Sequence, residues 1–129
     1  VEELLRYTTP VMYFCRQARH DTTVGGVPIA AGERIMLAYP SANRDERAFD
    51  RPDELDVARA PNDHVAFGGG GPHYCLGANL ARVEGRVIFE AILERFEGLE
   101  LAADPATLPT HHNVVHGYLE MPITWSAIR

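Results

Sequence analysis

The strongest pattern of hydrophobic and polar positions lies in residues 76–97. Apolar side chains recur there every three or four residues, with Leu80, Val83 and Val87 on one side of a helix and further apolar residues adjoining them. This spacing predicts one long helix that is buried on much of its surface. Gly98 follows directly, and a glycine at this position is a suitable C-terminal cap.

Before this helix the pattern differs. Residues 1–9 have the polar and apolar spacing of the end of a helix, which Pro10 stops. Residues 10–39 contain β-rich runs around the pair Gly25-Gly26, which predicts strands joined by tight turns. The N-terminal part is therefore expected to form a helix end followed by a small set of strands.

Two further segments are expected to hold less regular structure. Residues 40–66 have three prolines among many charges, which predicts irregular chain with one short helix at 41–48. An irregular stretch of this length is usually functional or held by ion pairs. Residues 98–129 predict short strands, with a turn near His116 and Gly117.

Composition narrows the possible functions. The chain has 129 residues, of which 46% are hydrophobic and 23% charged, the balance of one globular domain. Its net charge of −6 argues against nucleic-acid binding. All 12 lysine-or-arginine positions are arginines, so sites that need a lysine, such as a P-loop or a Schiff base, are excluded.

The sequence also indicates where in the cell the protein is expected. No apolar run approaches the ~20 residues of a membrane span. The acidic start VEELLRY lacks the build of a secretion signal and has no initiator methionine, so we expect a segment of a longer protein. Two cysteines, Cys15 and Cys75, are too few for a disulfide scaffold, and a cytoplasmic location is therefore expected.

Residues 67–77, FGGGGPHYCLG, are the strongest candidate for chemistry. Consecutive glycines let the backbone approach a flat or bulky partner without Cβ clashes. Cys75 falls near the start of the long helix, where backbone N–H groups and the helix dipole favour a thiolate, which is a metal ligand or a nucleophile. The alternatives are a small buried cysteine and a phosphate-binding loop, although the G-K-[ST], G-x-G-x-x-G and C-x-x-C patterns are all absent.

The same residues resemble the haem-ligand signature of the cytochrome P450 family, the haem-thiolate monooxygenases. Gly71, His73, Cys75 and Gly77 fall on that signature, and Phe67 lies one residue further from the cysteine than in its commonest form. The resemblance implies that Cys75 is the catalytic residue and the axial ligand of the haem iron. The cofactor-binding residues that it implies are Arg16, Phe67, Gly68, Gly71, His73, Cys75 and Gly77.

The resemblance covers nearly the whole chain. Glu3 and Arg6 match the family's E-x-x-R motif, which pairs with the irregular segment, and Arg59 is the candidate for the third partner of this ion pair. Arg16 and His73 fall where the family contacts the haem propionates, and a guanidinium fork suits a carboxylate. The substrate-contact candidates that the resemblance implies are Val11, Met12, Val114 and Val115.

Two sets of ionisable side chains remain. The first is a group of arginines that would give positive charge to the face receiving electrons from a redox partner: Arg59, Arg82 and Arg86. The second is a group of histidines that invites a metal-site interpretation: His111, His112 and His116. In strands and turns these histidines do not share a face as they would on a helix, so surface histidines are expected instead.

The resemblance implies an α+β chain, the C-terminal part of the mainly α-helical cytochrome P450 fold. The expected segments are the end of the K helix at 1–9, strands at 10–39, the meander at 40–66, the haem-ligand loop at 67–77, the L helix at 76–97 and C-terminal strands at 98–129.

The implied activity is the insertion of one oxygen atom of O2 into a C–H bond of a small hydrophobic substrate. The cofactor would be haem b, with electrons from NAD(P)H through a ferredoxin or a flavoprotein reductase. Blocks such as PVMYF and PSANRDE are similar to actinobacterial members that oxidise sterol side chains or branched lipids. By itself this segment is expected to be inactive, since the family's long distal helix is not in it; the alternative is a non-catalytic haem-binding remnant.

Overall fold

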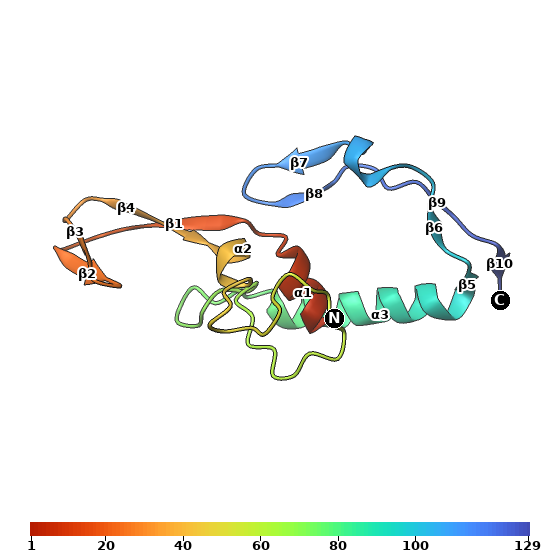
Figure 1. Cartoon of the computed structure of the whole chain (residues 1–129), viewed down its shortest axis with the longest axis horizontal. Helices are drawn as coiled ribbons and strands as arrows, with labels where there is room; N and C mark the ends of the chain where they lie inside the picture. Colours follow the sequence, from red (N-terminus) through yellow and green to blue (C-terminus); the bar gives the residue numbers. More distant parts are fainter.

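The computed structural model describes the backbone of residues 1–129 and the side chains of all of them except residue 112. The molecule is elongated, with a protruding hairpin at one end and the C-terminus at the other (Figure 1). Along these residues the elements are, in order, α1 (Glu2–Thr8), β1 (Tyr13–Gln17), β2 (Thr22–Val24), β3 (Val27–Ile29), β4 (Arg34–Ala38), α2 (Tyr39–Ala42), α3 (Ala78–Arg95), β5 (Phe96–Glu97), β6 (Glu100–Leu101), the 3₁₀ turn η1 (Pro105–Thr107), β7 (Thr110–His112), β8 (His116–Tyr118), β9 (Ile123–Thr124) and β10 (Ala127–Ile128).

Residues 10–39 form two antiparallel pairs of strands. β1 pairs with β4, so that Tyr13 lies opposite Ala38, and the chain between them folds into the β2–β3 hairpin. The hairpin turn is Gly25-Gly26, with φ of +56° and +83°. A two-residue turn that matches the strand twist needs positive φ at both positions, which glycine adopts without strain. The hairpin projects from the body of the molecule (Figure 1).

The irregular segment contains a shorter and earlier helix than the one expected at 41–48. α2 has Pro40 in its first turn, where the missing N–H breaks no helical hydrogen bond. The chain then leaves the helix at Asn43, which is fully buried. The Asn43 amide donates to Thr9 Oγ1 at 2.9 Å and accepts from the Val65 N–H at 2.8 Å. The prediction was wrong because these partners come from distant parts of the sequence.

The turn expected near His116 and Gly117 lies directly before these two residues. Both residues lie in β8, and the turn occupies residues 113–115. The His116 N–H donates to the Pro10 carbonyl at 2.7 Å, and the Met12 N–H donates to a carbonyl of the turn at 2.7 Å. The hairpin is therefore positioned by the segment that follows α1, which its own sequence does not show.

Gly98 is not the cap of the long helix. α3 ends at Arg95, and Gly98, with φ of +59°, forms the turn between β5 and β6. A Cβ atom at this position would lie 2.5 Å from the Ser126 Oγ. Glycine is required here both for its backbone conformation and for the close approach of the C-terminal strand.

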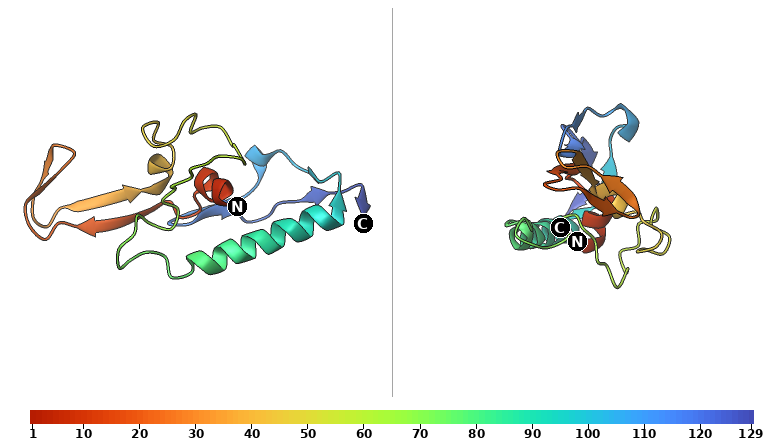
Figure 2. Two further views of the ribbon diagram at one scale, coloured as in Figure 1. Left: turned by 90° about the horizontal axis from the view of Figure 1, so that it is seen from below. Right: turned by 90° about the vertical axis from the view of Figure 1, so that its left-hand side faces the viewer.

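The long helix is much less buried than its pattern predicts. Ala78 is buried, whereas the apolar side chains further along α3 are exposed, Leu80 by 61% and Leu93 by 69%. In Figure 2 the helix lies along one side of the molecule, and no element covers its outer face. The prediction of burial on much of the surface is wrong for this chain because its other elements contact the helix from one side.

The core is small and polar. Among the described side chains, those of Arg6, Asn43 and Thr9 are the largest that are fully buried, and Phe49 and Ala66 are buried beside them. These residues lie where α1, the start of the irregular segment and the chain before the glycine-rich loop (residues 67–77) meet. The packing of this chain therefore depends on hydrogen bonds and ion pairs more than on a large apolar core.

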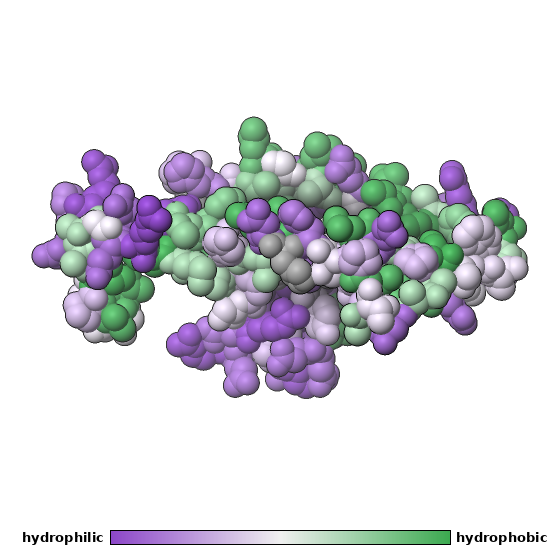
Figure 3. Space-filling model, turned by 90° about the horizontal axis from the view of Figure 1, so that it is seen from above, coloured by the Kyte–Doolittle hydropathy of each residue, from purple (hydrophilic) through white to green (hydrophobic). Residues whose placement is uncertain are grey.

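Apolar side chains face solvent over the C-terminal strands as well. Leu119 is 65% exposed and Met121 61% exposed. Figure 3 shows hydrophobic patches on this side of the molecule, next to the hydrophilic irregular segment. Exposed apolar surface of this extent is typical of a surface that other polypeptide covers.

Candidate functional site

The most buried charge of the chain belongs to Arg6 on α1. Its guanidinium donates to both oxygens of the Glu3 carboxylate, at 2.7 and 2.8 Å. The remaining donors reach three main-chain carbonyls of the irregular segment, those of Asn43, Pro52 and Glu54, at 2.7 to 3.1 Å. Arg6 thus fixes the path of a segment that has almost no regular structure of its own.

The Glu3 carboxylate has further partners from the irregular segment. Arg59 Nε lies 3.1 Å from one of its oxygens, the Asn62 amide donates to the other at 2.9 Å, and the Asp56 N–H donates at 3.0 Å. The structure therefore brings together Glu3, Arg6 and Arg59, the three residues that the sequence placed in this ion pair. Hydrogen bonds from Arg6, then from Asp56 and Arg59, lower the pKa of Glu3 from 4.5 to about 2 against the opposing effect of burial.

This depressed pKa predicts an acid-labile fold. Because the unfolded chain takes up a proton at Glu3 near pH 4.5 and the folded chain only near pH 2, stability is present above pH 4.5 and is lost as the pH falls toward 2. The free energy of unfolding of the full-length protein, measured in urea from pH 6 to pH 2, is expected to fall by a few kcal/mol through Glu3. Glu3→Gln should show a shallower pH slope; equal slopes for both proteins would contradict this assignment.

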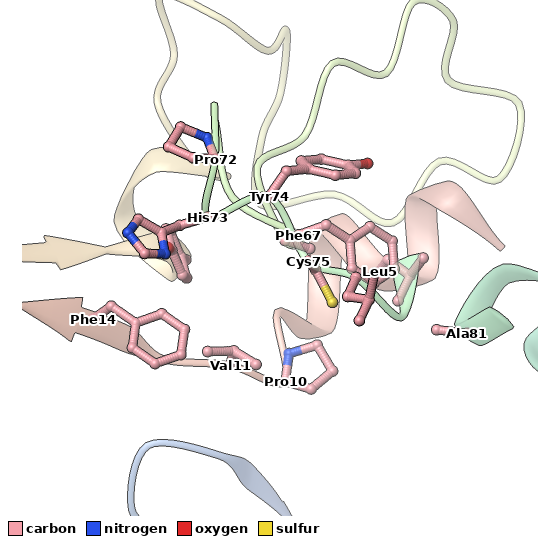
Figure 4. Close-up of a pocket in the computed structure, with 13 residues that line it drawn as sticks. Leu5, Pro10, Val11, Phe14, Phe67, Pro72, His73, Tyr74, Cys75 and Ala81 are labelled. Carbon is pink, nitrogen blue, oxygen red and sulfur yellow. The ribbon is translucent and has the colours of Figure 1, made fainter. Parts of the chain in front are cut away.

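The glycine-rich loop places Cys75 at the edge of an apolar cavity. The Cys75 N–H donates to the Phe67 carbonyl at 3.0 Å, which closes the loop on itself. Gly68, Gly70 and Gly71 have φ between +80° and +92°, so the loop needs glycine at these positions. Figure 4 shows the Cys75 sulfur pointing into the open space between the loop and the segment after α1.

The cavity has a volume of about 550 Å³, and its walls are mainly apolar. Leu5 and Val11 come from the N-terminal segment, Phe14 comes from β1, and Phe67 comes from the start of the loop. Cys75 contributes a sulfur atom to this wall. The space therefore suits a hydrophobic ligand, and the sulfur at its wall is a donor for a soft metal ion.

Polar groups lie on one side of this cavity. Arg16 and His73 line an adjoining hollow together with Phe14 and Tyr39. Both Arg16 and His73 are exposed, and the Arg16 Nη1 donates to the neighbouring Cys15 carbonyl at 3.0 Å. The structure thus brings together, from β1 and the loop, the two side chains expected at the haem propionates. The propionate carboxylates of a haem in the cavity would have two hydrogen-bond donors there, Arg16 and His73.

The four substrate-contact candidates also meet in space. Val11 and Val115 form an isolated antiparallel bridge, and the Met12 N–H donates to the Val114 carbonyl at 2.7 Å. Val11 reaches the cavity wall as well. This contact joins the segment after α1 to the β7–β8 hairpin, which lies above α1 in Figure 1.

Residues 1–119 match the family model described as "Cytochrome P450". The chain belongs to the cytochrome P450 family. A methyl-branched lipid omega-hydroxylase of Mycobacterium tuberculosis is 44% identical over 126 residues, which cover 98% of this chain and 29% of the relative. A steroid C26-monooxygenase of Rhodococcus jostii is 48% identical over 107 residues, which cover 83% of this chain and 23% of the relative.

Solved structures of the family agree with the fold. The cytochrome P450 PksS of Bacillus subtilis superposes with a TM-score of 0.90 at 44% identity, covering 97% of this chain and 32% of that protein. CYP105D6 superposes with a TM-score of 0.94 at 36% identity, covering 99% and 33%. The chain is α+β and has the architecture of the C-terminal portion of a cytochrome P450. It spans about a third or less of the length of these relatives.

The structure corrects one interpretation of the P450 sequence. Arg59 is bound to Glu3, and its side chain is only 9% exposed. Arg82 is paired with Glu2 through its Nε and Nη2 atoms at 2.9 and 3.0 Å. These two arginines therefore do not supply free positive charge to a redox partner, and of the three candidates Arg86 alone stays exposed without a paired carboxylate.

Several residues that support the P450 site carry no recognisable signal in the sequence. Glu2 precedes the E-x-x-R motif and pairs with Arg82, whose guanidinium carbon lies 4.7 Å from the centre of the Phe67 ring. Tyr39 lines both the cavity and the adjoining hollow. Asn43 joins three segments of the core. No spacing rule identifies them, because each acts on residues far away in the sequence.

The histidines of the C-terminal strands do not form a metal site in the described part of the chain. Among the described side chains, no group of three or more His, Cys, Asp or Glu is placed to hold a metal ion. His111 is exposed, as expected, whereas the side chain of His112 lies outside the described part of the chain.

Among the described residues, no helix is both long and apolar enough to cross a lipid bilayer.

Proposed function

We propose that this chain is the haem-thiolate portion of a bacterial monooxygenase, which inserts one oxygen atom of O2 into a C–H bond of a hydrophobic substrate. The observation that carries the proposal is the position of Cys75, whose sulfur points into an apolar cavity. Arg16 and His73 line the hollow beside it. A thiolate ligand, apolar walls and carboxylate-binding donors are the three features that a haem requires of its site.

Each residue has a defined task in this proposal. Haem b supplies the iron at which O2 is activated, and a thiolate ligand favours O–O cleavage. Cys75 provides that thiolate, while Phe67 forms part of the adjoining apolar wall. Arg16 and His73 orient the edge of the cofactor through their N–H donors. Gly68 and Gly71 allow the backbone conformation that brings Cys75 to the wall. Gly77 lies next to the Cys75 sulfur, and a Cβ atom there would be at an ordinary contact distance of 3.9 Å.

The proposed substrate is a sterol side chain or a methyl-branched lipid. Two relatives are named for such substrates, the methyl-branched lipid omega-hydroxylase and the steroid C26-monooxygenase. The side chains proposed to contact the substrate are apolar: Val11, Met12, Val114 and Val115. Apolar walls suit the hydrocarbon part of a lipid, which offers no hydrogen-bonding group. Electrons are proposed to come from NAD(P)H through a ferredoxin or a flavoprotein reductase.

The test uses the full-length protein that contains this chain. Its reduced carbon-monoxide complex is expected to give a thiolate-type absorption spectrum. With a ferredoxin, its reductase and NAD(P)H, it should hydroxylate a sterol or a methyl-branched fatty acid, which mass spectrometry detects. A thiolate-type spectrum without any product would favour the alternative, a non-catalytic haem-binding protein. A spectrum without the thiolate signature would contradict both.

Arg16→Ala is expected to weaken haem retention. Because the side chain faces the polar hollow, its loss removes one donor for a propionate while β1 keeps its pairing with β4. We expect haem transfer to apomyoglobin to become about tenfold faster, the lower end of the effects seen for residues that support a metal site. Arg19→Ala is the matched control, since Arg19 follows the same strand and is exposed. Equal transfer rates for the two variants would remove Arg16 from the cofactor site.

A further inference from the structure

Arg82 on α3 contacts both ends of the loop that carries Cys75. Its guanidinium carbon lies 4.7 Å from the centre of the Phe67 ring, at the start of the loop. Its Nη1 atom donates to the Tyr74 hydroxyl at 3.3 Å, one residue before the cysteine. Figure 4 shows that the Phe67 and Tyr74 side chains lie beside Cys75. One side chain of the helix therefore touches both flanks of the loop.

The guanidinium is itself fixed from a third element. Glu2 at the start of α1 accepts from Arg82 Nε at 2.9 Å and from Nη2 at 3.0 Å. His64 Nε2 lies 3.1 Å from the same carboxylate, and the His64 ring lies 5.9 Å from the Phe67 ring. The hydrogen bonds from Arg82 lower the pKa of Glu2 and raise that of Arg82, so both stay charged.

This geometry uses the properties that distinguish arginine from lysine. A planar guanidinium can stack on an aromatic ring while its edge donates two parallel hydrogen bonds to a carboxylate, which an ammonium group cannot do. The contact with Phe67 reaches Cys75 directly, because the Cys75 N–H donates to the Phe67 carbonyl at 3.0 Å. Movement of Phe67 would therefore move the backbone of the cysteine.

We propose that Arg82 is a positioning residue, which holds Phe67 and Tyr74 so that the loop presents the Cys75 sulfur to the haem in one fixed arrangement. The proposal rests on the proposed function of Cys75 as the haem ligand. In this proposal the Arg82–Glu2 pair links α1, α3 and the loop and limits their movement relative to one another. In this arrangement the positive charge of Arg82 is paired with Glu2 rather than free.

Three variants of the full-length protein separate positioning from simple charge. Arg82→Met removes both the stacking and the ion pair. Arg82→Lys keeps a positive charge beside Glu2 but loses the planar guanidinium that lies over the Phe67 ring. Arg86→Met, four residues further along the same helix, is the matched control because Arg86 is exposed. If Arg82→Met does not fold, the comparison of Arg82→Lys with Arg86→Met still tests the proposal.

The first measurement is amide hydrogen exchange at Cys75, which reports the order of the loop with or without bound haem. Loss of the planar guanidinium, with its contact to Phe67 and its two hydrogen bonds to Glu2, predicts exchange about three- to tenfold faster in Arg82→Lys, while Arg86→Met exchanges at the wild-type rate. The second is the rate at which the reduced carbon-monoxide complex loses its thiolate-type spectrum on mild warming. This rate is expected to rise about tenfold in Arg82→Lys and to stay unchanged in Arg86→Met.

A double-mutant cycle locates the effect. Phe67→Leu is expected to accelerate exchange at Cys75 as well, and Arg82→Lys should add little to it, because the two residues act through one contact. Additive effects, or wild-type exchange in Arg82→Lys, would overturn the positioning role. If the wild-type protein has no thiolate-type spectrum, the proposed function fails by itself. In that case the rate of amide hydrogen exchange at Cys75 would still show whether Arg82 orders the loop.

Discussion

Replacing Cys75 with serine is expected to abolish the thiolate-type spectrum of the reduced carbon-monoxide complex and to lower monooxygenase activity by more than about 100-fold. Loss of a residue that merely supports a metal ligand typically reduces activity about 10- to 100-fold, and loss of the ligand itself should exceed that. Serine keeps the size of the side chain and can keep the Cys75 N–H bond to Phe67, so the loop should still form. The measurement is the spectrum together with product formation in the full-length protein.

The chain contains its own control for this substitution. Cys15 is also a free, exposed cysteine, but it lies on β1 and is not part of the cavity wall. Cys15→Ser is expected to keep both the spectrum and the activity. A thiolate-type spectrum that survives in Cys75→Ser would show that another residue binds the iron, and the assignment of the site would be wrong.

Arg6→Ala is expected to have the largest effect on stability, about 3–5 kcal/mol in the free energy of unfolding. The Arg6 side chain is fully buried, and its removal would leave the buried Glu3 carboxylate without its strongest partner. Three main-chain carbonyls of the irregular segment would lose their donor as well. Urea unfolding of the full-length protein, followed by circular dichroism, measures this change.

The matched control is a pair with the same spacing on the surface. Arg51 Nη1 and Glu54 Oε2 lie 2.7 Å apart, also three residues apart in sequence, but the two side chains are 59% and 60% exposed. Arg51→Ala is expected to change the free energy of unfolding by less than about 1 kcal/mol. Equal effects of Arg6→Ala and Arg51→Ala would mean that burial does not govern the strength of the Glu3–Arg6 pair.

The Glu3–Arg6 and Arg51–Glu54 pairs show how much of the strength of an ion pair can be predicted from its spacing in the sequence. On a solvated helix, the spacing Glu3 to Arg6 predicts a contribution of about 0.2–0.5 kcal/mol. The Glu3–Arg6 pair is expected to contribute more than this because residues of the irregular segment, including Arg59 and Asn62, also bind the Glu3 carboxylate. The family motif identified the first three members of this cluster. Asn62 and Asn43 were not predicted, because amide side chains in a loop have no characteristic spacing.

Local sequence determined those features that depend on neighbouring residues. Gly25-Gly26 predicted a tight turn because positive φ is a property of single residues, and the run from residue 67 to 77 predicted a loop able to approach a ligand closely. The apolar period of residues 76–97 predicted the helix that forms as α3. The cysteine signature predicted the family, which the match over residues 1–119 shows.

Tertiary structure alone decided which groups are buried and which charges are paired. Arg82 was expected to offer positive charge to a redox partner, yet it is bound to the Glu2 carboxylate of α1, and the apolar stripe of α3 expected to be buried is exposed. The physical reason is that a side chain's solvation and its electrostatic partners depend on segments that meet only after folding. A sequence pattern shows which face of a helix is apolar, but only the folded chain determines what covers that face.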